Sequence, residues 1–273
     1  MSKLDVAGVQ QPLSEVANAG LERLEVFSDI TSTNTYLMAQ PPPPSGRFRV
    51  AIADHQTSGR GRHYRRWIST PGSGVYLSFA YTFPSQASPL EGLTLAIGVG
   101  VIGALRELEV EGVSLKWPND IVAKDGKLGG ILTEVQASKT KGVTVVTGIG
   151  LNVDIAEQMD FGAESDWAHM AVDLKSIKAD PPGRERIAAT LINNLYVTFR
   201  RFQDAGLAGF MDEWQQLDWL LGREITVDLP DKQITGVAAG VAEDGTLLVD
   251  SANGRVRVLS GSIVMAGPRG PHH

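Results

Sequence analysis

The spacing of the apolar residues changes near residue 221, and this change constrains the fold more than any other feature of the chain. Between residues 184 and 219, apolar side chains such as Ile187, Leu191 and Leu195 recur at helical spacing. After residue 221 the pattern becomes short alternating runs separated by turn sequences such as Glu243-Asp244-Gly245. We therefore expect a small all-β domain to follow a larger domain that contains helices.

The part of the chain before residue 221 mixes predicted strands with predicted helices. A glycine-containing apolar segment at 92–108 predicts a buried helix, in which the glycines allow close backbone approach. The prolines at 41–44 exclude a helix and predict an extended connection. Strands are predicted at residues 24–26, 50–53, 74–83, 112–117, 129–136 and 142–153. The resulting division is a polar leader (1–22), a mixed domain (23–220), an all-β domain (221–267) and a tail (268–273).

Composition excludes several classes of protein. The 273 residues include no cysteine, which excludes disulfides, cysteine-ligated zinc and thiol nucleophiles. No apolar run approaches a membrane span, and the N-terminal segment lacks the apolar core of a signal peptide. The 25 basic and 31 acidic side chains give a net charge of −6, so bulk charge does not favour a polyanionic partner. We expect a cytoplasmic protein with no membrane partner.

Four arginines stand close together in the sequence GRGRHYRRW, at residues 59–67. Gly59 and Gly61 let backbone N–H groups approach an anion, and guanidinium groups offer paired donors to phosphate or carboxylate oxygens. The same residues also fit a solvated surface loop or an arginine-rich contact with RNA. The predicted strands on both sides, together with Trp67 at its end, argue against a disordered RNA-binding arm.

Two lysine-containing motifs follow, and each has a structural and a ligand-binding interpretation. KWPND at 116–120 forms a good turn after a predicted strand. It also pairs the cation of Lys116 with Asp120, a carboxylate that can help to hold Mg²⁺ on phosphates. In KDGKLGGILTE at 124–134, Lys127 precedes two glycines at which the backbone can approach a ligand, but it equally fits an exposed hairpin lysine.

The motifs TSTN (31–34) and GIGLN (148–152) complete the set. TSTN is good N-cap chemistry and also suits ligand contact. GIGLN places Asn152, a partner for sugar hydroxyls or phosphates, after a β-branched strand, but the third glycine and the helix of a Rossmann fingerprint are missing. The five histidines lack metal-ligand spacing, so we expect no catalytic histidine. The sequence has neither a GxSxG nor a Walker motif, which excludes serine-hydrolase and P-loop interpretations.

Taken together and in this order, the motifs GRGRxxRxW, KWPND, KLxGILxE and GxGxN resemble those of biotin protein ligases, from about Glu25 through the small domain. The resemblance implies an α+β fold, with a class II synthetase-like mixed sheet and a C-terminal SH3-like β-barrel. It implies an ATP-dependent ligase (EC 6.3.4.15) that activates biotin as biotinyl-5′-AMP. The enzyme would transfer biotin to a lysine of a biotin carboxyl carrier domain of biotin-dependent carboxylases.

The resemblance also implies roles for residues of this chain, with the arginine loop closing over the ligands. The implied catalytic residues are Lys127, Arg62 and Arg65. The implied biotin-binding residues are Ser32, Thr33, Asn34, Gln56, Gly59, Arg60, Arg62, Lys127, Gly130, Gly148 and Gly150. The implied ATP-binding residues are Gly61, Arg62, Arg65, Trp67, Lys116, Asn119, Asp120 and Asn152, with Asp120 also on Mg²⁺. Biotin and ATP are then substrates and Mg²⁺ an activator, with no tightly bound cofactor.

Electrostatics agrees with these implied roles. The biotin carboxylate must attack the α-phosphate of ATP, and two anions repel each other unless cations lie between them. Arg62, Arg65, Lys127 and Mg²⁺ would offset that repulsion. The mixed anhydride formed in this way is reactive, so the second step needs only an oriented lysine amine.

The chain departs from the family pattern at the loop tip. The loops of the family usually read GRGRRGR, whereas His63 and Tyr64 stand here in place of arginine and glycine. The tip therefore lacks the freedom of glycine at positive φ. The roughly 22 residues before the mixed domain are too few for the helix-turn-helix domain of the family's repressor branch. We expect a monofunctional ligase without DNA binding.

Two alternatives stay open at this point. A lipoate ligase or lipoyl transferase shares the fold and the acyl-adenylate strategy, although its RRxxGGG signature is absent from the sequence. A nucleotide- or RNA-binding module would use the arginine loop without catalysis. Lys127 separates these interpretations, because a mere binding module has no chemistry to lose in Lys127→Ala.

Overall fold

A computed structural model describes residues 4–84, 89–136, 142–155 and 171–265, and the predicted tail at 268–273 lies outside these ranges. The larger unit is a seven-stranded sheet with the strand order β1-β2-β5-β9-β8-β7-β6. β1 and β2 are parallel and the other neighbours are antiparallel, so the sheet is mixed. The strands are β1 (Leu21–Ile30), β2 (Phe48–Gln56), β5 (Gly74–Phe83), β6 (Val113–Lys116), β7 (Asp120–Ala123), β8 (Gly126–Gln136) and β9 (Val143–Asn152).

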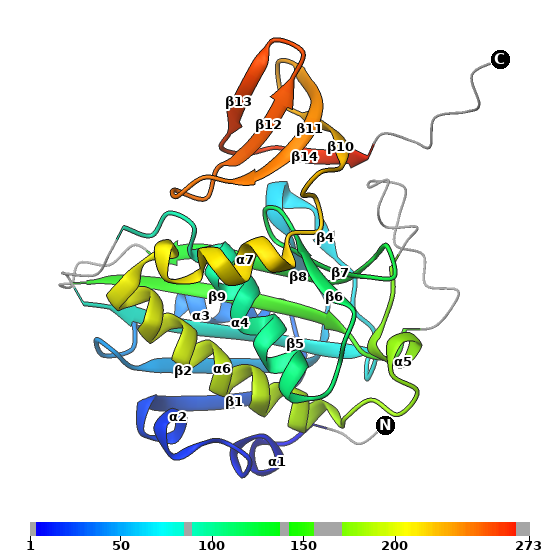
Figure 1. The fold of residues 1–273 in the computed structure, drawn as a ribbon. Helices are drawn as coiled ribbons and strands as arrows, with labels where there is room; N and C mark the ends of the chain where they lie inside the picture. The colour runs from blue at the N-terminus through cyan, green and yellow to red at the C-terminus, as the bar shows by residue number, and fades with distance from the viewer. Residues whose placement is uncertain (1–3, 85–88, 137–141, 156–170, 266–273) are drawn as a thin grey trace.

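Helices cover both faces of this sheet (Figure 1). α4 (Leu93–Glu107) and α6 (Arg184–Ala205) lie on one face, and α3 (Thr33–Ala39) lies on the other, against β2, β5 and β9. The core beneath α6 is aromatic, because Phe79 stacks on Phe48 and Phe199 with ring centroids 4.5 and 5.2 Å apart. A Cβ on Gly100 would overlap Thr198, which confirms that glycine lets α4 approach α6 closely. Among the described residues, none of the helices is long and apolar enough to span a bilayer.

Three elements differ from the sequence-based predictions. The helical region at 184–219 is two helices, α6 and α7 (Met211–Leu217), separated by a 3-10 turn at Leu207–Phe210. The break follows from Gly206, whose φ of 59° and ψ of −159° cannot continue a helix. β7 was predicted only as the end of a turn. The segment at 1–22 forms α1 (Val6–Gln10) and α2 (Glu15–Gly20), which pack against α6 and bury Leu4, Val9, Leu13 and Ala17.

The C-terminal unit is an antiparallel five-stranded sheet, so the predicted α+β fold with a small all-β C-terminal domain is confirmed. Its strand order is β13-β12-β11-β10-β14. These strands are β10 (Glu224–Asp228), β11 (Gln233–Val241), β12 (Leu247–Ser251), β13 (Gly254–Val258) and β14 (Ser262–Met265). The unit lies over the end of the large sheet near β6, β7 and β8 (Figure 1), where Trp117 Nε1 donates to Gly245 O at 3.0 Å. This contact fixes the small domain beside the KWPND turn.

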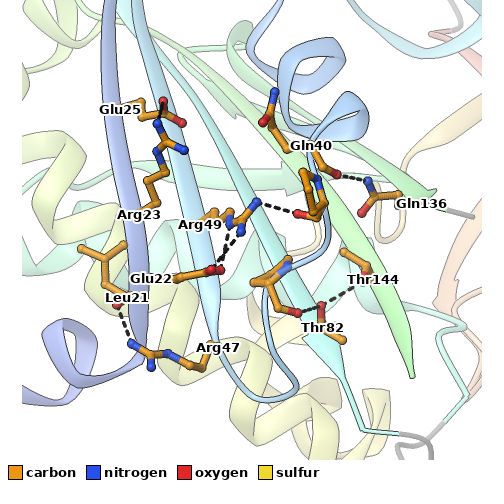
Figure 2. Close-up of polar contacts among 12 residues, drawn as sticks. Leu21, Glu22, Arg23, Glu25, Gln40, Arg47, Arg49, Thr82, Gln136 and Thr144 are labelled. Carbon is orange, nitrogen blue, oxygen red and sulfur yellow. Dashed lines mark hydrogen bonds and ion pairs between the residues drawn. The ribbon is translucent and has the colours of Figure 1, made fainter. Parts of the chain in front are cut away.

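The proline connection between α3 and β2 is held by side chains of three strands (Figure 2). Because proline has no N–H group, the carbonyl oxygens are the groups that the fold must satisfy here. The pairs are Arg49 Nη1 to Pro41 O at 2.6 Å, Thr82 Oγ1 to Pro43 O at 2.7 Å, and Gln136 Nε2 to Gln40 O at 2.7 Å. The predicted extended connection is confirmed, and it fixes the C-terminal end of α3.

Candidate active site

The predicted site residues surround one cavity of about 430 Å³. Every residue predicted for the site lines this cavity except Gly59. The order of the sheet explains the convergence, because β9 pairs with β8 and thereby places GIGLN beside KLGG. The small domain closes one side of the cavity with Asp228 and residues 261–264. The volume matches that of small-molecule sites in proteins.

The arginine-rich loop at 59–67, called here the arginine hairpin, has a two-stranded base. β3 (Gly59–Arg60) pairs with β4 (Arg66–Trp67), and a 3-10 turn, η1 (Arg62–Tyr64), joins them. A Cβ on Gly59 would lie 2.5 Å from Trp67 O, so this base requires glycine. At the tip the left-handed residue is His63, with φ 53°, and not Tyr64. Such a conformation costs a non-glycine residue about 1–2 kcal/mol, which the contacts of the hairpin must offset.

Each arginine of the hairpin contacts a different acceptor. Arg60 donates to a carboxylate, whereas the other three donate to an amide oxygen, a hydroxyl and a backbone carbonyl. The pairs are Arg60 with Glu134 (2.7 Å), Arg62 with Asn119 (3.3 Å), Arg65 with Ser262 (3.2 Å) and Arg66 with Thr57 O (3.1 Å). Neutral acceptors orient Arg62 and Arg65 without cancelling their charge, so both can still attract an anion in the cavity.

α3 begins at the cavity wall with the TSTN motif. Ser32 Oγ accepts from Thr35 N at 3.4 Å, which confirms the predicted N-cap. Thr33 donates its backbone N–H and its hydroxyl to Gln56 Oε1, at 2.9 and 3.1 Å. Ser78 Oγ lies 2.7 Å from Thr33 Oγ1 and 2.6 Å from Asn34 Oδ1. Linked in this way, these uncharged groups form an ordered polar wall, so the same residues cap a helix and line the cavity.

The glycines of β8 and β9 let side chains rest on the backbone of the sheet. A Cβ on Gly148 would lie 2.5 Å from Asn34 Oδ1, and one on Gly150 would lie 2.5 Å from the Trp67 ring. Gly130 is less crowded, because its Cβ would lie 3.2 Å from the same ring. The Trp67 indole Nε1 is buried and has no hydrogen-bond partner among the described residues.

Two lysines bring further positive charge to the KWPND side of the cavity. Lys127 Nζ lies 2.6 Å from Asp120 Oδ1 and 5.6 Å from the centre of the Trp67 ring. Lys116 is 3% exposed and donates to Ile263 O of the small domain at 3.4 Å. The cavity therefore holds both lysines close to the arginine hairpin.

Burial lowers the pKa values of several cationic groups around the cavity. It lowers the pKa of Lys116 to about 7, while Asp120 opposes this shift. Burial also lowers the pKa of Arg62, where Asp120 again opposes and Arg65 adds to the effect. The pKa of His63 is lowered by burial and then by Arg62 and Arg65. Arg62 remains protonated throughout, whereas an anion that enters the cavity would favour the protonated form of Lys116.

The two asparagines predicted for the site support its cationic residues. Asn119 Nδ2 donates to Ile131 O at 2.9 Å, while its Oδ1 accepts from Arg62. Asn152 Nδ2 donates to the backbone carbonyls of Lys127 and Val172, at 3.3 and 3.0 Å. These bonds fix the Arg62 guanidinium and the backbone of Lys127 respectively.

Several residues of the cavity escaped the sequence-based prediction. Ser78 is fully buried within the strand at 74–83, and a serine among large buried side chains is a usable signal. Ser262 and Ile263 carry no motif, so only the packing of the small domain reveals them. Glu134 belongs to the KLxGILxE motif but lies outside the cavity lining, and the motif alone does not indicate its contact with Arg60.

Two family models match the chain. Residues 26–152 match the biotin/lipoate A/B protein ligase family, and residues 220–265 match the biotin protein ligase C terminal domain. The second match coincides with the small all-β domain, and the first contains all the sequence motifs described above.

Individual proteins agree with these matches. The biotin--[acetyl-CoA-carboxylase] ligase of Mycobacterium tuberculosis is 32% identical over 255 residues, which cover 91% of each chain. The bifunctional ligase/repressor BirA of Escherichia coli is 32% identical over 228 residues, covering 82% of this chain and 68% of that protein. The solved biotin protein ligase of Aquifex aeolicus in complex with biotin and ATP is 27% identical, with a TM-score of 0.75 over 90% of this chain and 100% of the other.

Proposed function

The chain belongs to the biotin protein ligase family, and on this premise we propose that biotin reacts with ATP in the cavity beneath the arginine hairpin. The enzyme is an ATP-dependent ligase that activates biotin as biotinyl-5′-AMP and transfers it to a carboxylase. The observation that carries the site assignment is the convergence of lysine and arginine side chains on a cavity whose other wall is polar and uncharged. The six residues are Arg60, Arg62, Arg65, Arg66, Lys116 and Lys127, of which Arg60 is paired with Glu134 and Arg66 with a backbone carbonyl.

The uncharged wall suits the biotin head group. Thr33, Asn34 and Gln56 offer hydroxyl and amide groups of the kind that recognise a cyclic urea, with Ser32 beside them. Gly148 and Gly150 let Asn34 and the Trp67 ring pack directly on the sheet, which brings both side chains to the wall of the cavity. Arg60 at the base of the hairpin and Gly130 on β8 would bound the valeryl chain, and Gly59 would support Arg60 from outside the lining.

The KWPND side suits the nucleotide. Trp67 offers a half-buried aromatic surface for the adenylate, and Asn152 belongs to the same lining. Gly61, Arg62, Arg65 and Lys116 would bind the phosphates, and Asn119 would hold Arg62 in position. Among the described residues no group of three or more acidic or histidine side chains gathers as a metal cage. Asp120 alone fits Mg²⁺ that arrives on ATP, because nucleotide-bound Mg²⁺ uses one or two carboxylates and the phosphate oxygens.

In the first step, a biotin carboxylate oxygen attacks the α-phosphorus of ATP, the bond to the β-phosphate oxygen breaks, and pyrophosphate leaves. Lys127 and Arg62 would offset the repulsion between the two anions and the charge of the transition state. Asp120 holds the Lys127 ammonium in place at 2.6 Å. In the second step, the lysine amine of the carrier attacks the carbonyl carbon of the mixed anhydride, AMP leaves, and the amine releases a proton to water.

The acceptor and the location are inferred from the same reaction. We assign the acceptor to a biotin carboxyl carrier domain, since its lysine must reach the anhydride between the arginine hairpin and the sheet. We assign catalysis to residues 23–220 together with the small domain at 221–267, because Asp228, Ser262 and Ile263 complete the cavity. A cytoplasmic location follows from the need for ATP.

The decisive experiment incubates the purified protein with biotin and MgATP. We expect pyrophosphate release and labelling of a biotin carboxyl carrier domain, and Lys127→Ala should lower the adenylation rate by about a hundredfold or more. Lys124→Ala is the matched control, because this exposed lysine of the same hairpin donates to Ser176 O and lies outside the cavity. Incorporation of lipoate but not biotin would reject the substrate, and RNA binding without pyrophosphate release would reject the enzyme.

A further inference from the structure

Glu134 contacts two parts of the site although it does not line the cavity. Its Oε2 lies 2.7 Å from Arg60 Nη2, and its Oε1 lies 3.0 Å from the same nitrogen. Its Oε2 also accepts from Asn34 Nδ2 at 2.9 Å. One carboxylate thus connects the arginine hairpin to the first turn of α3.

Arg60 differs from Arg62 and Arg65 in its acceptor. Its side chain is 40% exposed and its guanidinium meets a carboxylate, whereas the guanidiniums of Arg62 and Arg65 meet neutral groups. The backbone of Arg60 pairs with Arg66 at the base of the hairpin. Pulling Arg60 toward β8 therefore draws the whole base of the hairpin against the sheet.

β8 holds α3 at both ends. Glu134 and Gln136 lie on the same face of the strand, because side chains alternate along it. Glu134 reaches Asn34 in the first turn, and Gln136 Nε2 donates to Met38 O and Gln40 O at the end of the helix, at 2.9 and 2.7 Å (Figure 2 shows the bond to Gln40). Of the two residues, Glu134 also reaches the arginine hairpin, whereas Gln136 contacts the helix. A substitution of Gln136 therefore tests support of the helix by itself, and a substitution of Glu134 tests support of both the helix and the hairpin.

We propose that Glu134 is a positioning residue that couples closure of the arginine hairpin to the orientation of Asn34. The inference rests on the proposed function, in which Asn34 contacts biotin and the hairpin retains the adenylate. A ligand that fixes Asn34 fixes its Glu134 partner, and the fixed carboxylate favours the closed position of Arg60. By reciprocity, a closed hairpin favours the orientation of Asn34 that binds biotin. Glu134 therefore governs retention of biotinyl-5′-AMP rather than its formation.

The test compares Glu134→Gln, Arg60→Gln, their double variant and the control Gln136→Ala. Glutamine at 134 keeps an oxygen for Asn34 and removes the charge that holds Arg60. We expect each single variant to release preformed labelled biotinyl-5′-AMP about fivefold faster, the effect of losing a half-exposed ion pair. The double variant should release it no faster than either single one, and the adenylation kcat of Glu134→Gln should change less than about twofold. Gln136→Ala should leave release within about twofold of the unaltered enzyme.

Additive effects in the double variant would show that the two residues act separately, and equal effects of Glu134→Gln and Gln136→Ala would show mere support of α3. Either result overturns the proposal. If the unaltered protein forms no adenylate, the proposed function fails instead. Hydrogen exchange of residues 59–67 then decides the coupling, because the proposal requires faster exchange in Glu134→Gln than in Gln136→Ala, and equal rates would overturn it.

Discussion

Gly150→Ala should displace Trp67 and weaken the active site. The added methyl carbon would lie 2.5 Å from two atoms of the Trp67 ring, about 0.9 Å inside the 3.4 Å at which ordinary contact begins. The sheet cannot yield, because β9 is paired on both sides, so the ring must move toward the cavity by about 1 Å. Overpacking of this kind costs about 1–3 kcal/mol, which corresponds to a loss of about 5- to 150-fold in binding.

The measurement is kcat/KM for biotin-dependent pyrophosphate release, with thermal unfolding followed in parallel. Gly130→Ala is the matched control, since its methyl carbon would lie 3.2 Å from the same ring and needs a shift of only about 0.2 Å. We expect Gly130→Ala to lose less than about threefold. If both variants lose activity equally while both remain folded, the position of Trp67 does not control the site and the reasoning is refuted.

Three further predictions concern the cations. The pKa of Lys116 is lowered to about 7, and bound phosphate should raise it. Binding of MgATP should therefore take up a proton, and its affinity should fall as pH rises above about 7. Calorimetry in two buffers should detect this proton uptake, and Lys116→Gln should abolish it. Ser262→Ala removes the acceptor of Arg65 and should raise the KM for ATP about two- to tenfold while the KM for biotin stays nearly constant, as steady-state kinetics can check. Arg62→Gly should speed the release of biotinyl-5′-AMP in a chase experiment, and unchanged retention would count against Arg62 as the cation that closes over the phosphate.

Much of the fold can be predicted from the sequence, because buried strands and helices show apolar runs or a regular spacing of apolar residues. The strand at 74–83 is predicted with its observed bounds, since most of its residues are apolar and all of them are buried. The strand β7 was missed because Asp120–Ala123 is too short to show a period after the turn. The N-terminal helices were missed for a related reason: each is about one or two turns long, and Val9 and Ala17 are buried only because α6 is there to receive them.

The residues of the site likewise fall into those that the sequence indicates and those that it does not. Motif residues such as Thr33, Lys127 and Gly150 carry local signals of capping, turns and close approach, and the structure brings them to one cavity. Residues that contact a motif residue from a distant position in the sequence carry no such local signal. Arg60 and Glu134 are 74 positions apart, and Arg65 and Ser262 are 197 apart, so only the three-dimensional fold reveals these pairs.

The contribution of β14 to the cavity bears on the moment at which the enzyme first becomes competent during its synthesis. Ribosomes build the chain from the N-terminus, so the motifs from TSTN to GIGLN emerge and can pair into the sheet long before residues 261–264 exist. Until those residues leave the exit tunnel, Arg65 lacks Ser262 and Lys116 lacks the carbonyl of Ile263. A nascent chain therefore lacks both contacts, and the cavity acquires its full set of lining residues only after residues 261–264 have been synthesised.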